Sequence, residues 1–160
     1  MERPKNVVAT GDLPWHEEAH GPMRLRERWL AEAAGGGKIG TSLVELEPGA
    51  HSWPSHYHLA NDEAVYVLAG SGTLRLGEKT IPIATGDYIA FPAGEPEAHH
   101  IMNDSSATLR YLAISTMLYP EVAYYADADK IGVRHGAPDD PKRLSLNFEL
   151  KSAIDFWKGE

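Results

Sequence analysis

Short runs with the composition of strands fill most of the chain from residue 39 to residue 115. Turns rich in glycine, proline, asparagine and aspartate separate these runs, and no convincing amphipathic helix interrupts them. Short strands at this spacing are typical of an antiparallel sandwich or barrel rather than of alternating strands and helices. The pattern predicts an all-β fold with strands at residues 39–46, 52–58, 64–69, 73–76, 80–83, 88–91, 99–103 and 109–115.

The residues before this region divide into an irregular arm and one further strand. Three prolines discourage regular structure in residues 1–22. Residues 23–30 alternate, which places Arg24, Arg26 and Arg28 on one face. Three arginines are able to hold a phosphate or carboxylate, but a charge run usually faces solvent, and we favour that interpretation. Residues 1–38 are therefore predicted to form an arm and a strand that pack on a barrel.

The chain changes character after Tyr119, where polar and turn residues replace the alternation. Phe156 and Trp157 nevertheless lie close to the C-terminus, and aromatic pairs of this kind favour docking on another surface. We predict a barrel over residues 39–118, followed by a tail over residues 119–160 that packs on the barrel or on a second subunit. A homodimer is expected, because two-fold dimers are the commonest assemblies.

The composition mainly excludes certain partners and kinds of metal site. The 160 residues suit one domain, and a net charge of -8 offers no basic face for nucleic acid or for an anionic membrane. The chain has no cysteine, so a metal site here must use histidine, carboxylate or neutral oxygen ligands. No apolar run has the length of a signal peptide or a bilayer span, so a cytoplasmic location is expected.

The candidate chemistry lies in two segments of the predicted barrel. His56 and His58 are separated by one residue, so both side chains lie on the same face of a strand, and Glu63 follows after a short loop. Two imidazoles and a carboxylate are potential ligands of a divalent metal. A further histidine, His99, lies in a second segment that glycine and proline punctuate.

Together these segments resemble the two motifs of the cupin superfamily. The first reads G-x6-H-x-H-x4-E-x6-G from Gly49 to Gly70, and the second reads G-x5-P-x-G-x4-H-x3-N from Gly86 to Asn103. The resemblance covers residues 39–116 and implies a small jelly-roll β-barrel, also called a double-stranded β-helix.

The resemblance further implies that His56, His58, Glu63 and His99 hold one divalent metal ion. The second motif departs from the usual pattern, with four residues between Gly94 and His99 instead of two, and His100 competes for the fourth position. The spacing from His99 to Asn103 favours His99. A set of three imidazoles and one carboxylate suits Mn²⁺, Fe²⁺, Zn²⁺, Ni²⁺ or Co²⁺.

His51 is a candidate general base, because it lies five residues before His56 and histidine is the usual acid–base side chain. The alternative is a polar residue of the strand. His16 and His20 have a helical spacing in a stretch that is a poor helix, so neither is expected to be a ligand, and His135 is expected to be exposed.

Small cupins of this kind resemble sugar or sugar-phosphate isomerases and epimerases, which implies an enzyme acting on a small polyoxygenated substrate. The alternatives are a mononuclear iron dioxygenase, a manganese-dependent decarboxylase or a non-catalytic module that binds a small molecule. In each case the expected partner is a small molecule, and neither nucleic acid nor a membrane is expected to bind.

Overall fold

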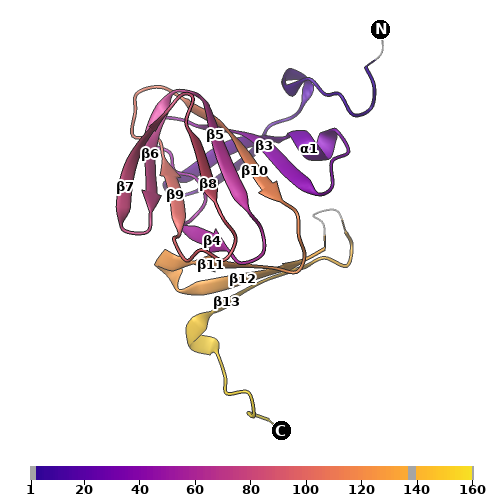
Figure 1. Ribbon diagram of the computed structural model, residues 1–160, viewed down its shortest axis with the longest axis vertical. Helices are drawn as coiled ribbons and strands as arrows, with labels where there is room; N and C mark the ends of the chain where they lie inside the picture. The colour runs from indigo at the N-terminus through magenta and orange to yellow at the C-terminus, as the bar shows by residue number, and fades with distance from the viewer. Residues whose placement is uncertain (1–2, 137–139, 160) are drawn as a thin grey trace.

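The computed structural model describes residues 3–136 and 140–159 and contains two antiparallel sheets that face each other (Figure 1). The first sheet has the strand order β1-β2-β3-β10-β5-β8. Its strands are β1 (His16–His20), β2 (Met23–Trp29), β3 (Ile39–Leu46), β10 (Leu109–Thr116), β5 (Glu63–Ala69) and β8 (Tyr88–Phe91).

The second sheet has the order β13-β12-β11-β4-β9-β6-β7. Its strands are β13 (Leu144–Glu149), β12 (Lys130–His135), β11 (Glu121–Tyr125), β4 (His56–His58), β9 (His99–Met102), β6 (Ser71–Leu76) and β7 (Lys79–Ala84). The helical elements among the described residues are short: α1 (Leu30–Ala33), η1 (Thr10–Asp12), η2 (Ala126–Ala128) and η3 (Leu150–Ser152). None of them is long and apolar enough to cross a membrane.

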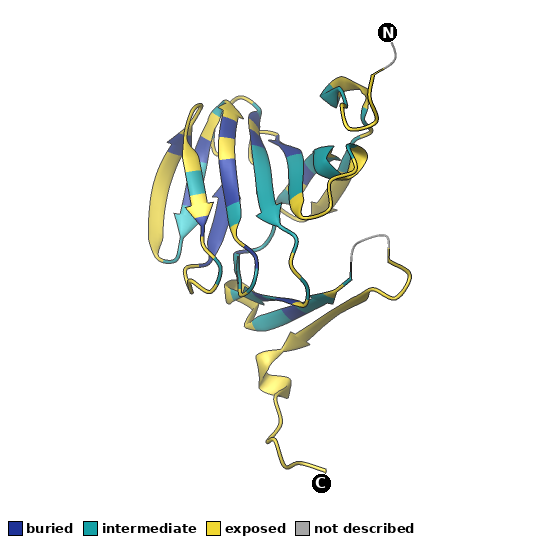
Figure 2. Cartoon of the chain, turned by 45° about the vertical axis from the view of Figure 1, so that its right-hand side comes forward, coloured by how far each residue is buried: buried dark blue, intermediate teal, exposed yellow. Residues whose placement is uncertain are grey.

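The core lies between the two sheets and uses the inward side of the alternating pattern. Val44 and Leu46 on β3 and Val67 on β5 have no exposed surface, and Leu74 on β6 closes the core from the second sheet. Residues that alternate with these point outward, because side chains in a strand repeat every two residues. The all-β prediction and the jelly-roll architecture are thus confirmed, and Figure 2 shows the buried positions concentrated in the barrel strands.

The arginine face of β2 is mostly committed to contacts within the chain. Arg26 donates from Nε to Glu45 Oε2 over 2.7 Å, and Arg28 lies 4.1 Å from the centre of the Trp15 ring. Glu45 is buried with 1% exposure, so Arg26 balances a buried carboxylate, and Trp15 ties the arm to the sheet. These contacts leave little of the face for an anionic ligand.

The structure differs from the sequence prediction in one barrel strand and in the arm and tail. Residues 52–58 do not form one strand, because Pro54 interrupts the run and only β4 remains. The arm contains β1, which pairs with β2, and the tail contributes β11, β12 and β13 to the second sheet. The boundaries of arm, barrel and tail at residues 38/39 and 118/119 stay a prediction.

Candidate metal centre

The candidate metal centre lies where the two sheets meet at one end of the barrel. His56 and His58 come from β4, and β9 lies beside β4 with His99 opposite His56 in the register. Glu63 comes from the other sheet, at the first position of β5. The site therefore forms only when the two sheets pack face to face.

The carboxylate of Glu63 is the point on which three imidazoles converge. The Nε2 atoms of His58 and His99 lie 3.3 Å and 3.2 Å from its oxygens, and that of His56 lies 3.9 Å away. The ligand atoms of His56, His58 and Glu63 all lie within 4.8 Å of one another. Neighbouring ligands of an ion with bonds of about 2.1 Å are roughly 3.0–3.4 Å apart. The separations of His58 and His99 from Glu63 lie in this range, and that of His56 is wider.

Two of the imidazoles have partners on Nδ1, which leaves Nε2 for a ligand. His56 Nδ1 lies 2.7 Å from the carbonyl oxygen of Pro54, an acceptor, so Nδ1 carries the proton and Nε2 carries the lone pair. His58 Nδ1 lies 3.5 Å from Glu121 Oε1. Both ring nitrogens of His58 are buried without a hydrogen bond, which is costly for polar atoms unless an ion binds one of them. The residues present thus fit a divalent metal.

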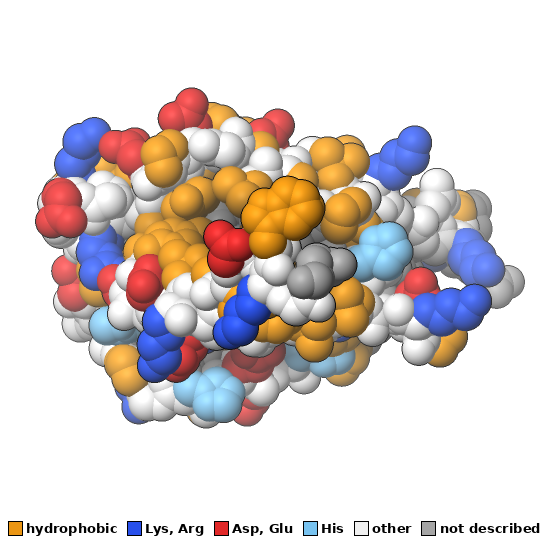
Figure 3. Space-filling model, turned by 90° about the horizontal axis from the view of Figure 1, so that it is seen from below, with side chains coloured by type: hydrophobic (Ala, Val, Ile, Leu, Met, Phe, Trp, Pro, Cys, Tyr) orange, Lys and Arg blue, Asp and Glu red, His pale blue; other side chains and the backbone are white. Residues whose placement is uncertain are grey.

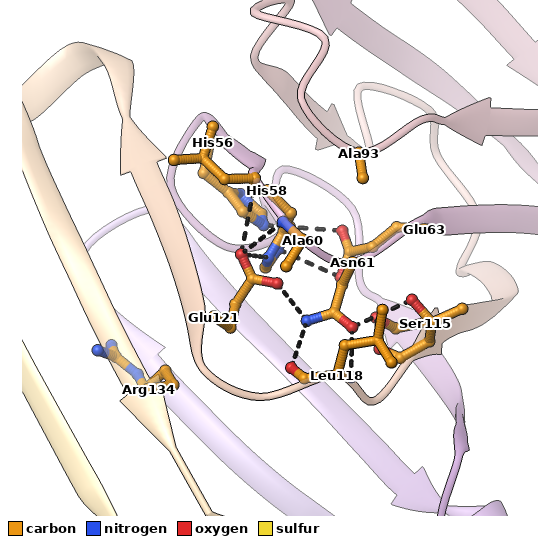
Figure 4. A network of polar contacts seen from close by, with 12 residues as sticks. His56, His58, Ala60, Asn61, Glu63, Ala93, Ser115, Leu118, Glu121 and Arg134 are labelled. Carbon is orange, nitrogen blue, oxygen red and sulfur yellow. Dashed lines mark hydrogen bonds and ion pairs between the residues drawn. The ribbon is translucent and has the colours of Figure 1, made fainter.

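Glu121 is held behind His58 by a network of donors (Figure 4). Its Oε1 accepts the backbone amides of Leu59 and Ala60 over 3.1 Å and 3.4 Å, and its Oε2 accepts Asn61 Nδ2. Asn61 in turn donates to the carbonyl of Leu118 and accepts its amide. A carboxylate behind a ligating histidine orients the ring and raises its basicity, so Glu121 has the place of such a partner.

Charges in the cluster set the protonation states that a metal requires. Burial, reinforced by His99, lowers the pKa of His56 to about 4. Burial raises the pKa of Glu63, but the contact with His99 and the charges of the neighbouring histidines outweigh it and lower that pKa to about 2. Burial lowers the pKa of His58, but Glu121 and Glu63 outweigh it and raise that pKa above its usual value. At neutral pH His56 is therefore neutral and Glu63 ionised, as ligands must be.

Apolar side chains shield one side of the centre, and a cavity opens beside it. The Phe91 ring stacks on His99 with the ring centres 3.8 Å apart and the planes at 13°. The cavity has a volume of about 260 Å³, and its lining includes His58, His99, Phe91 and the carboxylates of Glu95 and Glu97. Its size suits a small molecule.

The other predicted residues lie elsewhere. His51 Nδ1 lies 3.1 Å from His100 Nε2, and His100 alternates with His99 along β9, so its side chain lies on the opposite face of that strand. Of the two candidates for the fourth ligand, His99 is the one in contact with Glu63. The general-base role of His51 stays a prediction, and its contact with His100 lends it no support. His135 is exposed, as expected.

Sequence reasoning missed the contributions of the tail to this site. Glu121 is buried with 4% exposure, and the Tyr125 ring lies 5.7 Å from the ring of His56. Both residues belong to β11, which pairs with β4 although the two strands are far apart in the sequence. The one available signal was the isolated Val-Ala-Tyr-Tyr run after Glu121, which has the composition of a strand.

Comparisons with known proteins agree with this architecture. The family model of the cupin domain matches residues 42–115. The structure of a candidate sugar phosphate isomerase from Acidithiobacillus ferrooxidans superposes with a TM-score of 0.83 at 28% identity, covering 94% of this chain and 96% of that one. A sugar phosphate isomerase from Silicibacter pomeroyi gives a TM-score of 0.81 at 27% identity, covering 92% and 94%.

More distant structures share the barrel alone. A predicted oxalate decarboxylase from Thermotoga maritima gives a TM-score of 0.60 at 24% identity and covers 70% of this chain and 99% of that one. The search of curated proteins gave no match. The family match, the two facing sheets and the solved structures lead to one assignment: the barrel of this protein is a cupin domain, and the chain belongs to the cupin superfamily.

Proposed function

We propose that this protein is a metal-dependent enzyme of the isomerase or epimerase type, acting on a small polyoxygenated substrate such as a sugar or sugar phosphate. His56, His58, Glu63 and His99 would hold one divalent ion. The observation that carries the proposal is the convergence of three Nε2 atoms on the Glu63 carboxylate, with His58 Nε2 buried and unpartnered. The likeness to two structures described as sugar phosphate isomerases supports the substrate class.

The residues of the chain supply orientation and a dry environment for this chemistry. When bound, the metal would polarise the oxygens of the substrate as a Lewis acid. Glu121 fixes the ring of His58, and Phe91 keeps water from the face of His99. The adjoining cavity, about 260 Å³ in volume, has room for a substrate of a few carbon atoms.

Metal analysis and proton exchange together test this proposal. We expect purified wild-type protein to contain one divalent metal per chain by mass spectrometry, and His58→Ala to contain none. With pentose and hexose phosphates in D₂O, the loaded enzyme should exchange the proton on the carbon beside the carbonyl group, as followed by NMR. His51→Ala tests the predicted base, and Lys151→Met, at an exposed position of the tail, is the control.

The alternatives lead to different results in the same experiments. Oxygen consumption by an iron-loaded protein, or release of CO₂ from oxalate by a manganese-loaded one, would replace the isomerase proposal with a dioxygenase or a decarboxylase. Stoichiometric metal without turnover of any sugar phosphate, alongside tight binding of one, would favour a non-catalytic binding protein. The likeness to an oxalate decarboxylase lies below 25% identity and supports the fold only.

We also propose that the chain forms a homodimer through its C-terminal segment. Ile154, Phe156 and Trp157 are 64%, 83% and 71% exposed, so the aromatic pair does not dock on its own barrel. Seen from below, hydrophobic side chains lie among charged ones on this side of the molecule (Figure 3). Exposed aromatic side chains so closely spaced favour burial against a second copy.

A further inference from the structure

The strands β4, β11 and β12 form a continuous sheet whose metal-facing side extends into the tail. His56 pairs with Tyr125 in the register, and Tyr125 pairs with Lys130. Directly paired residues of antiparallel strands have side chains on the same face. The contacts agree, because the Tyr125 ring lies 5.7 Å from that of His56, and Lys130 Nζ lies 4.9 Å from the centre of the Tyr125 ring. Lys130 therefore lies on the face that carries the metal ligands.

The next row of this sheet has very small side chains. His58 pairs with Ala123, and Ala123 pairs with Gly132. A Cβ atom at Gly132 would lie 3.0 Å from Arg134 Nη1 and 3.0 Å from the side-chain oxygen of Asn147. The glycine thus makes room for the Arg134 guanidinium close above the sheet, on the same face as His58.

Arg134 lies opposite Glu121 in the register but does not form an ion pair with it among the described residues. Its hydrogen bonds go to neutral acceptors, namely the carbonyls of Val133 and Leu146, over 3.1 Å and 2.8 Å, and the side-chain oxygen of Asn147. The guanidinium is therefore fixed in position with its positive charge uncompensated by a carboxylate.

Five other cations in the described ranges form ion pairs with carboxylates. These pairs are Arg26 and Arg110 with Glu45, Arg75 with Asp127, Lys79 with Glu97, and Lys151 with Glu149. Lys130 and Arg134 have no such pair in the described part of the chain, although the protein carries a net charge of -8. Other described cations, such as Arg24 and Lys38, also have no ion pair. What points to an anionic ligand is the position of Lys130 and Arg134 on the face of the sheet that carries the metal ligands.

We propose that the face of β12 beside the metal centre is an anion subsite, where Arg134 and Lys130 bind the phosphate group of a sugar phosphate. This inference rests on the proposed function for the identity of the sugar, but not for the binding of the anion. Strands in a sheet are about 4.8 Å apart, so β12 lies roughly 10 Å from β4, which is close to the span of a phosphorylated pentose or hexose. Glu95 and Glu97 line the cavity beside His58, whose lining includes neither Lys130 nor Arg134.

Inorganic phosphate, titrated by calorimetry into metal-stripped protein, tests the subsite apart from the metal. We expect Arg134→Gln and Lys130→Met each to weaken phosphate binding at least about tenfold, the effect of losing one charge-assisted contact. Gln at position 134 retains a donor for the carbonyl of Leu146, and Arg134→Lys, which retains the charge, should keep most of the affinity. The control is Lys151→Met, whose side chain is 80% exposed and should leave binding unchanged.

The outcomes separate this proposal from the proposed function. Equal phosphate affinity in wild type, Arg134→Gln and Lys130→Met would overturn the subsite, even if metal analysis supports the centre. The subsite would also be overturned if Arg134→Gln and Arg134→Lys lower thermal stability equally without changing phosphate affinity. Arg134 would then only stabilise the packing of β12 on β13. Phosphate binding that depends on Arg134 in a protein that takes up no metal would support the subsite and overturn the isomerase proposal.

Discussion

Glu121 offers the sharpest test of how the tail acts on the metal centre, through the variant Glu121→Gln. Every contact of this carboxylate is with a donor: the amides of Leu59 and Ala60, Asn61 Nδ2 and His58 Nδ1. The amide of glutamine has an NH₂ group in place of one oxygen, so in either orientation one donor of the network faces another. The ring of His58 then loses the carboxylate that orients it.

The expected magnitude follows from this loss. Removing a partner of a ligating histidine typically lowers metal affinity by about 10–100-fold, which corresponds to about 1.4–2.7 kcal/mol. The mismatched donors are buried, and they cost about 1–3 kcal/mol in the free energy of unfolding. Competition with a fluorescent chelator measures the affinity, and thermal unfolding measures the stability. Glu47→Gln, at a side chain that is 60% exposed, is the matched control.

Proton release provides a second readout with a defined sign. Burial lowers the pKa of His58, but Glu121 and Glu63 raise it above its usual value, so a metal must displace a proton from a larger fraction of molecules near neutral pH. Without the Glu121 charge this pKa falls, and fewer protons are released on metal binding, as calorimetry in buffers of different ionisation enthalpy measures. Unchanged affinity and unchanged proton release in Glu121→Gln would refute the role of Glu121 behind His58.

Three further predictions address the fourth ligand, the core and the assembly. His99→Ala should lose stoichiometric metal and His100→Ala should keep it, by mass spectrometry; the opposite result would transfer the ligand role to His100. Leu46→Ala should lower the free energy of unfolding by about 2–5 kcal/mol in urea, because the Leu46 side chain has no exposed surface. Phe156→Ser combined with Trp157→Ser should convert a dimer into a monomer in light scattering, and a monomeric wild type would contradict the homodimer proposal.

The barrel was predictable from sequence because its strands carry their own signal. Residues 39–46 are predicted as one strand between two turn segments, and the observed β3 has the same bounds. Periodicity also places His56 and His58 on one face without any knowledge of the fold. It does not bring Glu63 or His99 to them, since β5 belongs to the other sheet and β9 lies far along the chain. Residue type and the spacing of the segments made them candidates, and the resemblance to the cupin motifs implied the set of four ligands.

The tail was not predictable in the same way. β11 is buried because it pairs with β4, and nothing local to Glu121 reveals that pairing. Asp127 and Asp129 form the turn between β11 and β12, as their residue types indicate, but the strands on either side depend on tertiary pairing. The position of Arg134 could not be predicted for the same reason. It lies on the same face as His58 only through two successive strand pairings.

Because the ligands come from two different sheets, the packing of the core between the sheets affects the geometry of the metal centre. Glu63 shares its inward face with Val65 on β5, whereas His99 shares its face with Ile101 on β9. Val65 and Ile101 are 6% and 3% exposed and belong to one core cluster, so their packing sets the distance between the sheets and hence the 3.2 Å contact of Glu63 with His99. A cavity there would let the sheets shift relative to each other. Substitutions at these two positions should therefore weaken metal binding more than an equally destabilising change at Ile83, which lies in the same core on β7 but away from the ligand-bearing strands.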